Sequence, residues 1–214
     1  MKNRQVPVIS IRKRPQQGRS TRLVTDIKEA AARVLARNGV QKFTTARVAE
    51  VAGVSVGSLY QYYPSKEAIL FQLQTDEWER TGALLDSILA NSQEPAPERL
   101  RSMVSAFFQS EFEEASLRTA LEDAAPLYRD APEVRKHRMI VMRRAAAFMT
   151  EALPQVPVNE RRLAGAVLMT TMSAVGKSIS EQAHSKSEAD TWALAVGEMF
   201  CAYLQWLAER KRSE

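Results

Sequence analysis

The sequence holds few of the residues that build metal centres and disulfide frameworks. Its 214 residues include one cysteine, Cys201, and two histidines, His137 and His184. A single cysteine forms no internal disulfide and excludes a cysteine-based zinc site, and two histidines leave little material for a histidine-bound metal. We therefore expect a protein without metal or other cofactor.

Long apolar runs are missing as well. The longest charge-free stretch of the second half, residues 163–176, has 14 residues and includes three hydroxyl side chains, so it is too short and too polar to cross a bilayer. Near the N-terminus, the apolar segment 6–11 is short and interrupted by Pro7, unlike a secretory signal. These absences predict a cytoplasmic protein.

The charge is distributed unevenly along the chain. Residues 1–47 carry 12 Lys and Arg and 2 acidic residues, a net charge of +10. Residues 48–214 carry 18 Lys and Arg and 23 acidic residues, a net charge of −5, so that the whole chain has a net charge of +5. A basic beginning on a mildly acidic chain suggests that the first segment meets a polyanion. Residues 1–20 hold six basic residues and no acid, which is typical either of a flexible basic arm or of a solvated tail.

Helical periodicity runs through the whole chain, and no segment alternates like a β-strand for more than a few residues. Prolines, glycines and helix-capping hydroxyl residues divide the sequence into segments. We therefore expect an all-α protein of about nine helices, over residues 22–38, 45–51, 56–62, 66–90, 98–115, 117–125, 132–152, 159–184 and 188–211. The expected domains are a basic arm over 1–20, a small helical domain over 21–66 and a larger helical domain over 67–214.

Two short helices joined by a tight turn lie within residues 44–66. Gly53 suits the turn because it lacks a Cβ atom, and Ala49 is small enough for a second helix to cross closely. One side of the second helix is polar and made of small residues. This pattern is typical of a helix-turn-helix whose second helix enters the major groove of DNA. The alternative from spacing alone is an ordinary helical hairpin.

A longer pattern over residues 20–70 carries a family resemblance. It reads Thr44-Thr45-x-x-Val48-Ala49-x-x-Ala52-Gly53-Val54-Ser55-x-Gly57-x-Leu59-Tyr60-x-Tyr62-Tyr63-x-x-Lys66-x-x-Leu70. In these positions the chain resembles the DNA-binding domain of the tetracycline-repressor (TetR) family. The resemblance implies a homodimeric bacterial transcription regulator, usually a repressor, whose variable C-terminal domain binds a small ligand.

The same resemblance implies a set of DNA contacts. Residues at the start of each helix would bind phosphate, and the second helix would approach base edges. The implied positions are Thr45, Arg47, Ser55, Val56, Gly57, Ser58, Tyr60, Gln61, Tyr62 and Lys66. Some family members have a base-reading arginine where this chain has Ala46, so one direct base contact is missing here.

The side chains of the expected reading helix limit how sequence is recognised. Val56 and Gly57 offer no side-chain hydrogen bonds, so specificity would depend on Ser58, Gln61, contacts with thymine methyl groups and DNA shape. The basic arm is a further candidate, with residues that could lie along the backbone or in a minor groove. These are Arg12, Lys13, Arg14 and Arg19.

A competing motif overlaps the turn. Gly53-Val54-Ser55-Val56-Gly57 fits the G-x-S-x-G pattern of serine hydrolases, which requires a strand before the serine and an acid and a histidine further on. Residues 47–52 have helical character, and no parallel strands follow. The sequence therefore disfavours a hydrolase.

The two final helices favour a dimer. Apolar residues occupy most of the circumference of the last helix, so two of its sides must be buried. The helix before it carries small residues that permit the close approach of another helix. We expect a four-helix dimer interface that includes Gly165, Ser173, Trp192, Val196, Met199, Tyr203 and Trp206. The alternative is a helix buried inside a monomer.

Methionine and aromatic residues gather in the second part of the chain, where seven of the eight methionines lie beyond residue 100. Such side chains adapt to varied apolar shapes and suit a hydrophobic ligand cavity, although the same residues also fill ordinary cores. The expected pocket residues are Met103, Phe107, Phe108, Phe112, Met139, Met142, Phe148, Met169 and Met172.

Together these patterns predict a ligand-responsive, sequence-specific DNA-binding regulator. We expect a repressor that a small, largely apolar effector releases from a palindromic operator. The alternatives are a ligand-independent regulator, an architectural protein that coats duplex DNA without choosing sequence, and a protein that binds membrane surfaces through its basic arm.

Overall fold

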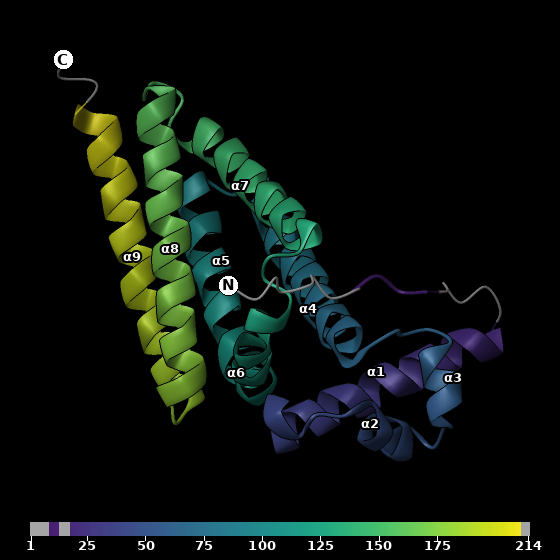
Figure 1. Cartoon of the computed structure of the whole chain (residues 1–214). Helices are drawn as coiled ribbons and strands as arrows, with labels where there is room; N and C mark the ends of the chain where they lie inside the picture. Colours follow the sequence, from purple (N-terminus) through teal and green to yellow (C-terminus); the bar gives the residue numbers. More distant parts are fainter. Residues whose placement is uncertain (1–8, 13–17, 211–214) are drawn as a thin grey trace, which may run out of the picture. The chain divides into compact units, whose positions relative to one another are not determined.

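The computed structural model describes residues 9–12 and 18–210, and this part of the chain consists of helices joined by loops, without a β-strand (Figure 1). Its α-helices are α1 (Gly18–Asn38), α2 (Thr45–Ala52), α3 (Val56–Tyr60), α4 (Lys66–Leu89), α5 (Ala96–Glu113), α6 (Ala115–Ala124), α7 (Pro132–Ala152), α8 (Val158–Gln182) and α9 (Lys186–Arg210). The all-α fold of nine helices is thereby confirmed, and most boundaries agree within two residues. Within these ranges, no helix is long and apolar enough to span a membrane.

The chain divides into two compact units. The N-terminal unit consists of residues 1–79 together with 116–135, and the C-terminal unit consists of residues 80–115 together with 136–214. The division falls after residue 79 of α4, and the expected boundary after residue 66 lies in the same helix, thirteen residues earlier. The difference arises because α6 and the first half of α4 pack with the DNA-binding helices, as their side chains show.

The core of the N-terminal unit is built from short-range helical patterns. In α1 the residues Ile27, Ala30, Ala31, Val34 and Leu35 recur at intervals of three and four and are all buried. They join Phe43, Leu59 and Tyr63, none of which has measurable exposure, in one hydrophobic cluster. Removing so much apolar surface from water is the main force that holds α1, α2 and α3 together.

A buried polar network ties α6 to the first half of α4. Arg118 Nη2 lies 2.9 Å from Glu77 Oε1, and these side chains are only 10% and 6% exposed. Gln74 Nε2 donates to Glu77 Oε2 at 3.2 Å, and the Tyr128 hydroxyl lies 3.2 Å from both Gln74 Oε1 and the carbonyl of Leu121. Burial, together with the negative charge of Glu77, raises the pKa of the Tyr128 hydroxyl above its ordinary value.

The C-terminal unit is organised around α5. This helix packs along α9 and against α8, and the three helices share a second hydrophobic cluster that includes Leu100, Phe108 and Phe200 (Figure 1). Gly197 of α9 lies against Arg101 of α5, where a Cβ atom would reach ordinary contact with the Arg101 backbone at 3.6 Å. A buried guanidinium, that of Arg99, pairs with Glu151 and donates to the carbonyl of Leu89 at 2.5 Å.

Helix α7 is the least buried helix of this unit. Between Val134 and Phe148, both buried, thirteen consecutive residues include none that is buried. Met139, Ile140 and Met142 are exposed within that stretch. Arg144 Nη2 pairs with Asp86 of α4 at 2.9 Å, which gives the middle of α7 a polar attachment to its own unit.

Candidate nucleic-acid interface

Local capping fixes the two helices of the helix-turn-helix. The Thr44 side chain accepts from the Arg47 N–H at the start of α2, and the Ser55 side chain accepts from the Ser58 N–H at the start of α3. Between them Gly53 adopts φ 68° and ψ 30°, the left-handed region that favours glycine. These three residues therefore set where each helix begins and ends, as the sequence pattern predicts.

One face of α3 is open to solvent. Val56, Gly57, Tyr60 and Gln61 are exposed, whereas Leu59 is fully buried beneath them. We call the exposed set, with the half-buried Ser58, the α3 ridge. A Cβ atom at Gly57 would meet only Ser55 Oγ, at 3.8 Å, so the ridge is low and unobstructed at that point. A short outward-facing ridge of this kind has the dimensions that major-groove binding requires.

The start of α2 lies beside the ridge. The Thr45 Oγ1 and Tyr60 hydroxyl oxygens are 3.1 Å apart and share a hydrogen bond. Arg47 is exposed on the next turn, and Lys66 is half-buried at the start of α4, where the Ser65 side chain accepts from the Ala68 N–H. The structure thus joins Thr45 to the ridge directly, and the DNA contacts expected of Arg47 and Lys66 stay predictions.

The two adjacent tyrosines after the ridge are both buried. Tyr62 has 6% of its surface exposed and belongs to the hydrophobic cluster of the N-terminal unit. Its ring therefore has a packing role, and the phosphate contact expected of its hydroxyl stays a prediction. For Tyr63, burial and the negative charge of Asp76 raise the pKa of the hydroxyl above its ordinary value, which keeps the phenol neutral.

Sequence reasoning missed an anchor before the first helix. Ile9 is buried in the cluster of the N-terminal unit, and the Arg12 N–H donates to the carbonyl of Tyr62 at 2.9 Å. The signal available in the sequence was the alternation of Ile9 and Ile11 with polar residues. Residues 1–8 and 13–17, which include Lys13 and Arg14, lie outside the described residues.

The hydrolase motif lacks its required context. Residues before Ser55 form α2 rather than a strand, and the Ser55 side chain serves as the cap of α3. Its Oγ lies 2.9 Å from the Ser58 Oγ. A nucleophile elbow needs a strand-to-helix turn, so the structure supports the sequence-based rejection of a serine hydrolase.

The residues expected to line a ligand pocket fall into two groups. Met103, Phe108, Phe148 and Met172 are buried in the core of the C-terminal unit, and Phe107, Phe112 and Met169 are half-buried there. In contrast, Met139 and Met142 of α7 are 64% and 49% exposed. The pocket assignment stays a prediction, and the buried members act at least as core.

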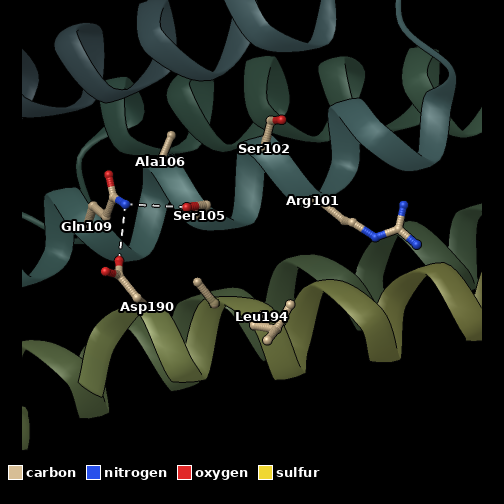
Figure 2. Close-up of a pocket in the computed structure, with 8 residues that line it drawn as sticks. Arg101, Ser102, Ser105, Ala106, Gln109, Asp190 and Leu194 are labelled. Carbon is tan, nitrogen blue, oxygen red and sulfur yellow. Dashed lines mark hydrogen bonds between the residues drawn. The ribbon is translucent and has the colours of Figure 1, made fainter. Parts of the chain in front are cut away.

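A groove of about 470 Å³ lies between α5 and α9, and none of the expected pocket residues lines it. Figure 2 shows Gln109 of α5 facing Asp190 of α9, with Ser105 beside Gln109 on α5 and Leu194 further along α9. Gln109 Nε2 donates to Asp190 Oδ1 at 3.1 Å and lies 3.5 Å from Ser105 Oγ. The polar groups of the groove are largely engaged with one another.

At the other end of the groove, Arg101 bridges α5 and α9. Its Nε donates to Glu198 Oε1 at 2.6 Å, and its Nη1 lies 2.9 Å from Glu98 Oε2. The hydrogen bond from Arg101 lowers the pKa of the Glu198 carboxyl below its ordinary value.

The expected dimer residues separate in the same way. Ser173, Trp192, Met199 and Trp206 are exposed, and Tyr203 is half-buried with its ring stacked on Trp206 at 6.2 Å between centroids. Gly165 and Val196 are buried inside the unit, and their place in a dimer interface stays a prediction. A Cβ atom at position 165 would contact Met149 Cγ of α7 at 3.4 Å.

Solved structures confirm the fold. NalD of Pseudomonas aeruginosa, described as the secondary repressor of a multidrug efflux pump, is 17% identical with a TM-score of 0.66, covering 85% of this chain and 96% of its own. A putative TetR-family regulator from Mesorhizobium loti is 17% identical with a TM-score of 0.65, and the match covers 87% of this chain and 98% of that protein. FadR of Bacillus subtilis, solved with stearoyl-CoA, is 19% identical with a TM-score of 0.59, and the match covers 83% of this chain and 97% of FadR. A search of curated proteins finds no match.

Two family models match the chain. One describes bacterial regulatory proteins of the tetR family and matches residues 27–73, which include α2, α3 and the ridge. The other describes the tetracyclin repressor-like C-terminal domain and matches residues 95–207, more than half of the chain. With its capped helix-turn-helix and helical second unit, the chain belongs to the TetR family of DNA-binding transcription regulators.

Proposed function

We propose that this transcription regulator represses genes by binding a palindromic operator as a dimer, and that a small, largely apolar effector releases it. The observation that carries the DNA part is the α3 ridge, exposed above a fully buried Leu59 and hydrogen-bonded to the start of α2 through Tyr60 and Thr45. A rigid scaffold that holds a small outward helix is what base readout requires.

Two exposed rows of side chains support the dimer. On α9, Trp192, Ala195, Met199, Ala202 and Trp206 follow one another at intervals of three and four, and all are exposed. On α8 the same spacing relates Leu163, Val167, Thr170 and Ala174, which are also exposed. We call these the α8 and α9 rows. Apolar rows with this spacing are typical of helix pairs that pack along their length.

The dimer would give the DNA interaction its symmetry. Two ridges related by a two-fold axis read two half-sites about one turn of DNA apart, which makes the operator an inverted repeat. A monomer would lose the second half-site and with it most of the affinity. In this proposal the protein acts in the cytoplasm, where the operator is.

The DNA proposal is tested by adding a negative charge to the ridge. A duplex is first selected from random DNA with the wild-type protein, and its affinity is measured at physiological salt. Gly57→Glu should abolish that binding, because a carboxylate would face the phosphates and the groove. The protein should stay folded, since position 57 is open. Gln155→Glu, an exposed change in the C-terminal unit, is the matched control and should bind normally.

The same measurement distinguishes a regulator from an architectural protein. A sequence-specific regulator should keep its selected duplex against unrelated DNA by a factor of roughly a thousand or more. A much smaller ratio, or normal binding by Gly57→Glu, would contradict the proposal.

The effector part rests on the methionine and aromatic residues of the C-terminal unit and on similarity to effector-binding relatives. FadR of Bacillus subtilis was solved with stearoyl-CoA, which makes that compound a reasonable first probe. A tenfold loss of operator affinity on adding it corresponds to about 1.4 kcal/mol of coupling, and the operator must weaken stearoyl-CoA binding by the same factor. Operator affinity unchanged by stearoyl-CoA and by a panel of apolar compounds would favour a ligand-independent regulator.

A further inference from the structure

The segment before α1 is fitted to the surface of the N-terminal unit. Ile9 is buried with 6% of its surface exposed, Ser10 is exposed, Ile11 is partly buried against the same cluster, and Arg12 is exposed. Exposure therefore alternates along this short bent segment, and the two isoleucines face the core. We call residues 9–12 the N-terminal clasp.

The clasp ends at the α3 ridge. The Arg12 N–H donates to the carbonyl of Tyr62 at 2.9 Å, and Arg12 Nη1 donates to the carbonyl of Tyr60, the last residue of α3, at 3.4 Å. Tyr60 is also the residue whose hydroxyl meets Thr45 Oγ1. An exposed guanidinium, the end of the reading helix and the start of α2 therefore form one continuous surface.

The chemistry of this surface suits a phosphodiester. A guanidinium has five N–H donors, and the bond to Tyr60 uses one of them. It retains its positive charge at any physiological pH and binds phosphate oxygens in pairs. The backbone bond to Tyr62 and the buried side chain of Ile9 hold Arg12 in place before DNA arrives, which reduces the entropy lost on binding.

We propose that Arg12 is a DNA phosphate contact of the reading surface and that Ile9 and Ile11 are its positioning residues. This inference rests on the proposed DNA-binding function. It differs from the general expectation of a basic arm, because it assigns one residue a fixed place beside α3. A purely structural role, in which Arg12 only caps the end of α3, is the competing explanation.

Arg12→Gln separates the two explanations. Glutamine keeps an N–H donor for the Tyr60 carbonyl but carries no charge. On the selected duplex, the salt slope of log affinity should fall by about 0.9, the value for one phosphate contact. The advantage of wild type over Arg12→Gln should then shrink about threefold as salt rises from 50 to 200 mM. The loss should be uniform over operator variants, because a phosphate contact carries no base information.

The matched control is Arg143→Gln, an exposed arginine of α7 in the C-terminal unit. It removes the same charge and should leave the slope unchanged. An unchanged slope for Arg12→Gln, or an equal fall for Arg143→Gln, would overturn the proposal. If the wild-type protein selects no duplex at all, the proposed function fails instead, so the two failures are distinguishable.

The positioning role is tested with Ile9→Ser. This variant keeps every charge but removes an apolar side chain from the core, so it should lower the slope as Arg12→Gln does. The double variant should then show no further fall, since both changes remove the same contact. Circular dichroism checks the fold, and Ile9→Val serves as a milder variant if Ile9→Ser does not fold. A wild-type slope in a folded Ile9 variant, or additive losses in the double variant, would contradict the positioning role.

Discussion

The two units differ in how much of their large apolar surface their own residues bury. In the described part of the N-terminal unit, the exposed large apolar residues are Val51, Val56 and Tyr60, and the last two lie on the α3 ridge. The C-terminal unit exposes many more, grouped on α7, α8 and α9. The first unit therefore buries nearly all of its large apolar residues and exposes two on the ridge that we propose for DNA binding, whereas the second presents apolar surface that a partner outside the chain would cover.

This difference predicts different responses to mutation. Substitutions in the core and turns of the N-terminal unit should act mainly through its own stability, because these groups contact one another. Exposed positions of α8 and α9 should instead affect assembly while the fold stays intact. Four changes test that contrast, in decreasing order of expected size.

Glu77→Ala should cause the largest loss of stability. It breaks the buried ion pair with Arg118, and removing one partner of such a pair costs about 3–5 kcal/mol of unfolding free energy. Urea denaturation followed by circular dichroism measures the loss. Replacing both residues, as Glu77→Leu with Arg118→Leu, should recover most of the loss because the buried guanidinium is then removed as well. A loss below about 1 kcal/mol for the single variant would show that the pair is not what joins α6 to α4.

Met199→Glu should change assembly rather than folding. The side chain is 49% exposed in the α9 row, so a carboxylate is tolerated in the single chain but is costly in an apolar interface. Sedimentation should show half the wild-type mass, with an unchanged helical signal. The matched control is Leu194→Glu, on the groove side of the same helix and 67% exposed. If Leu194→Glu separates the dimer and Met199→Glu does not, the interface is on the groove side.

Gly53→Ala should have a moderate effect confined to the N-terminal unit. The cost is about 1 kcal/mol and comes only from the backbone, because φ is 68° and a Cβ atom would meet nothing within 4 Å. Gly53→Asn should cost less, since asparagine tolerates left-handed backbone angles better. Thermal unfolding measures both. Equal losses for alanine and asparagine would mean that the turn relaxes to other angles.

His137→Gln should give the smallest effect, seen only in the pH dependence of the C-terminal unit. Burial, with the positive charge of Arg144, lowers the pKa of His137 below 6.5. As the pH falls, the unfolded chain therefore takes up the proton first. The contribution of His137 to stability is fully present above pH 6.5 and is lost as the pH falls through its lowered pKa. The variant should lose less thermal stability than wild type between pH 7 and pH 5. Identical profiles would show that His137 does not contribute.

The sequence predicts the helices well and the surfaces less well. Caps such as Thr44 and Ser55 act within a few residues, so their effects can be read along the chain. Burial depends on residues far apart in sequence, so the sequence does not reveal that Gly165 and Val196 are buried within their own unit. Both have the small or apolar character of an interface residue, and the sequence alone does not distinguish that role from packing inside the unit.

The same reasoning explains the omission of Ile9. The alternation with polar residues covers only Ile9 and Ile11, too few positions to indicate a core segment in a basic, proline-containing stretch. The cluster that buries Ile9 includes residues such as Leu59 and Tyr62, about fifty residues later in the sequence.

Gly57 has an evolutionary consequence. At the centre of the reading surface it leaves room for any side chain, and the caps and core that hold α3 lie elsewhere. A gene duplicate could therefore acquire a new target sequence through one substitution there, at little cost in stability.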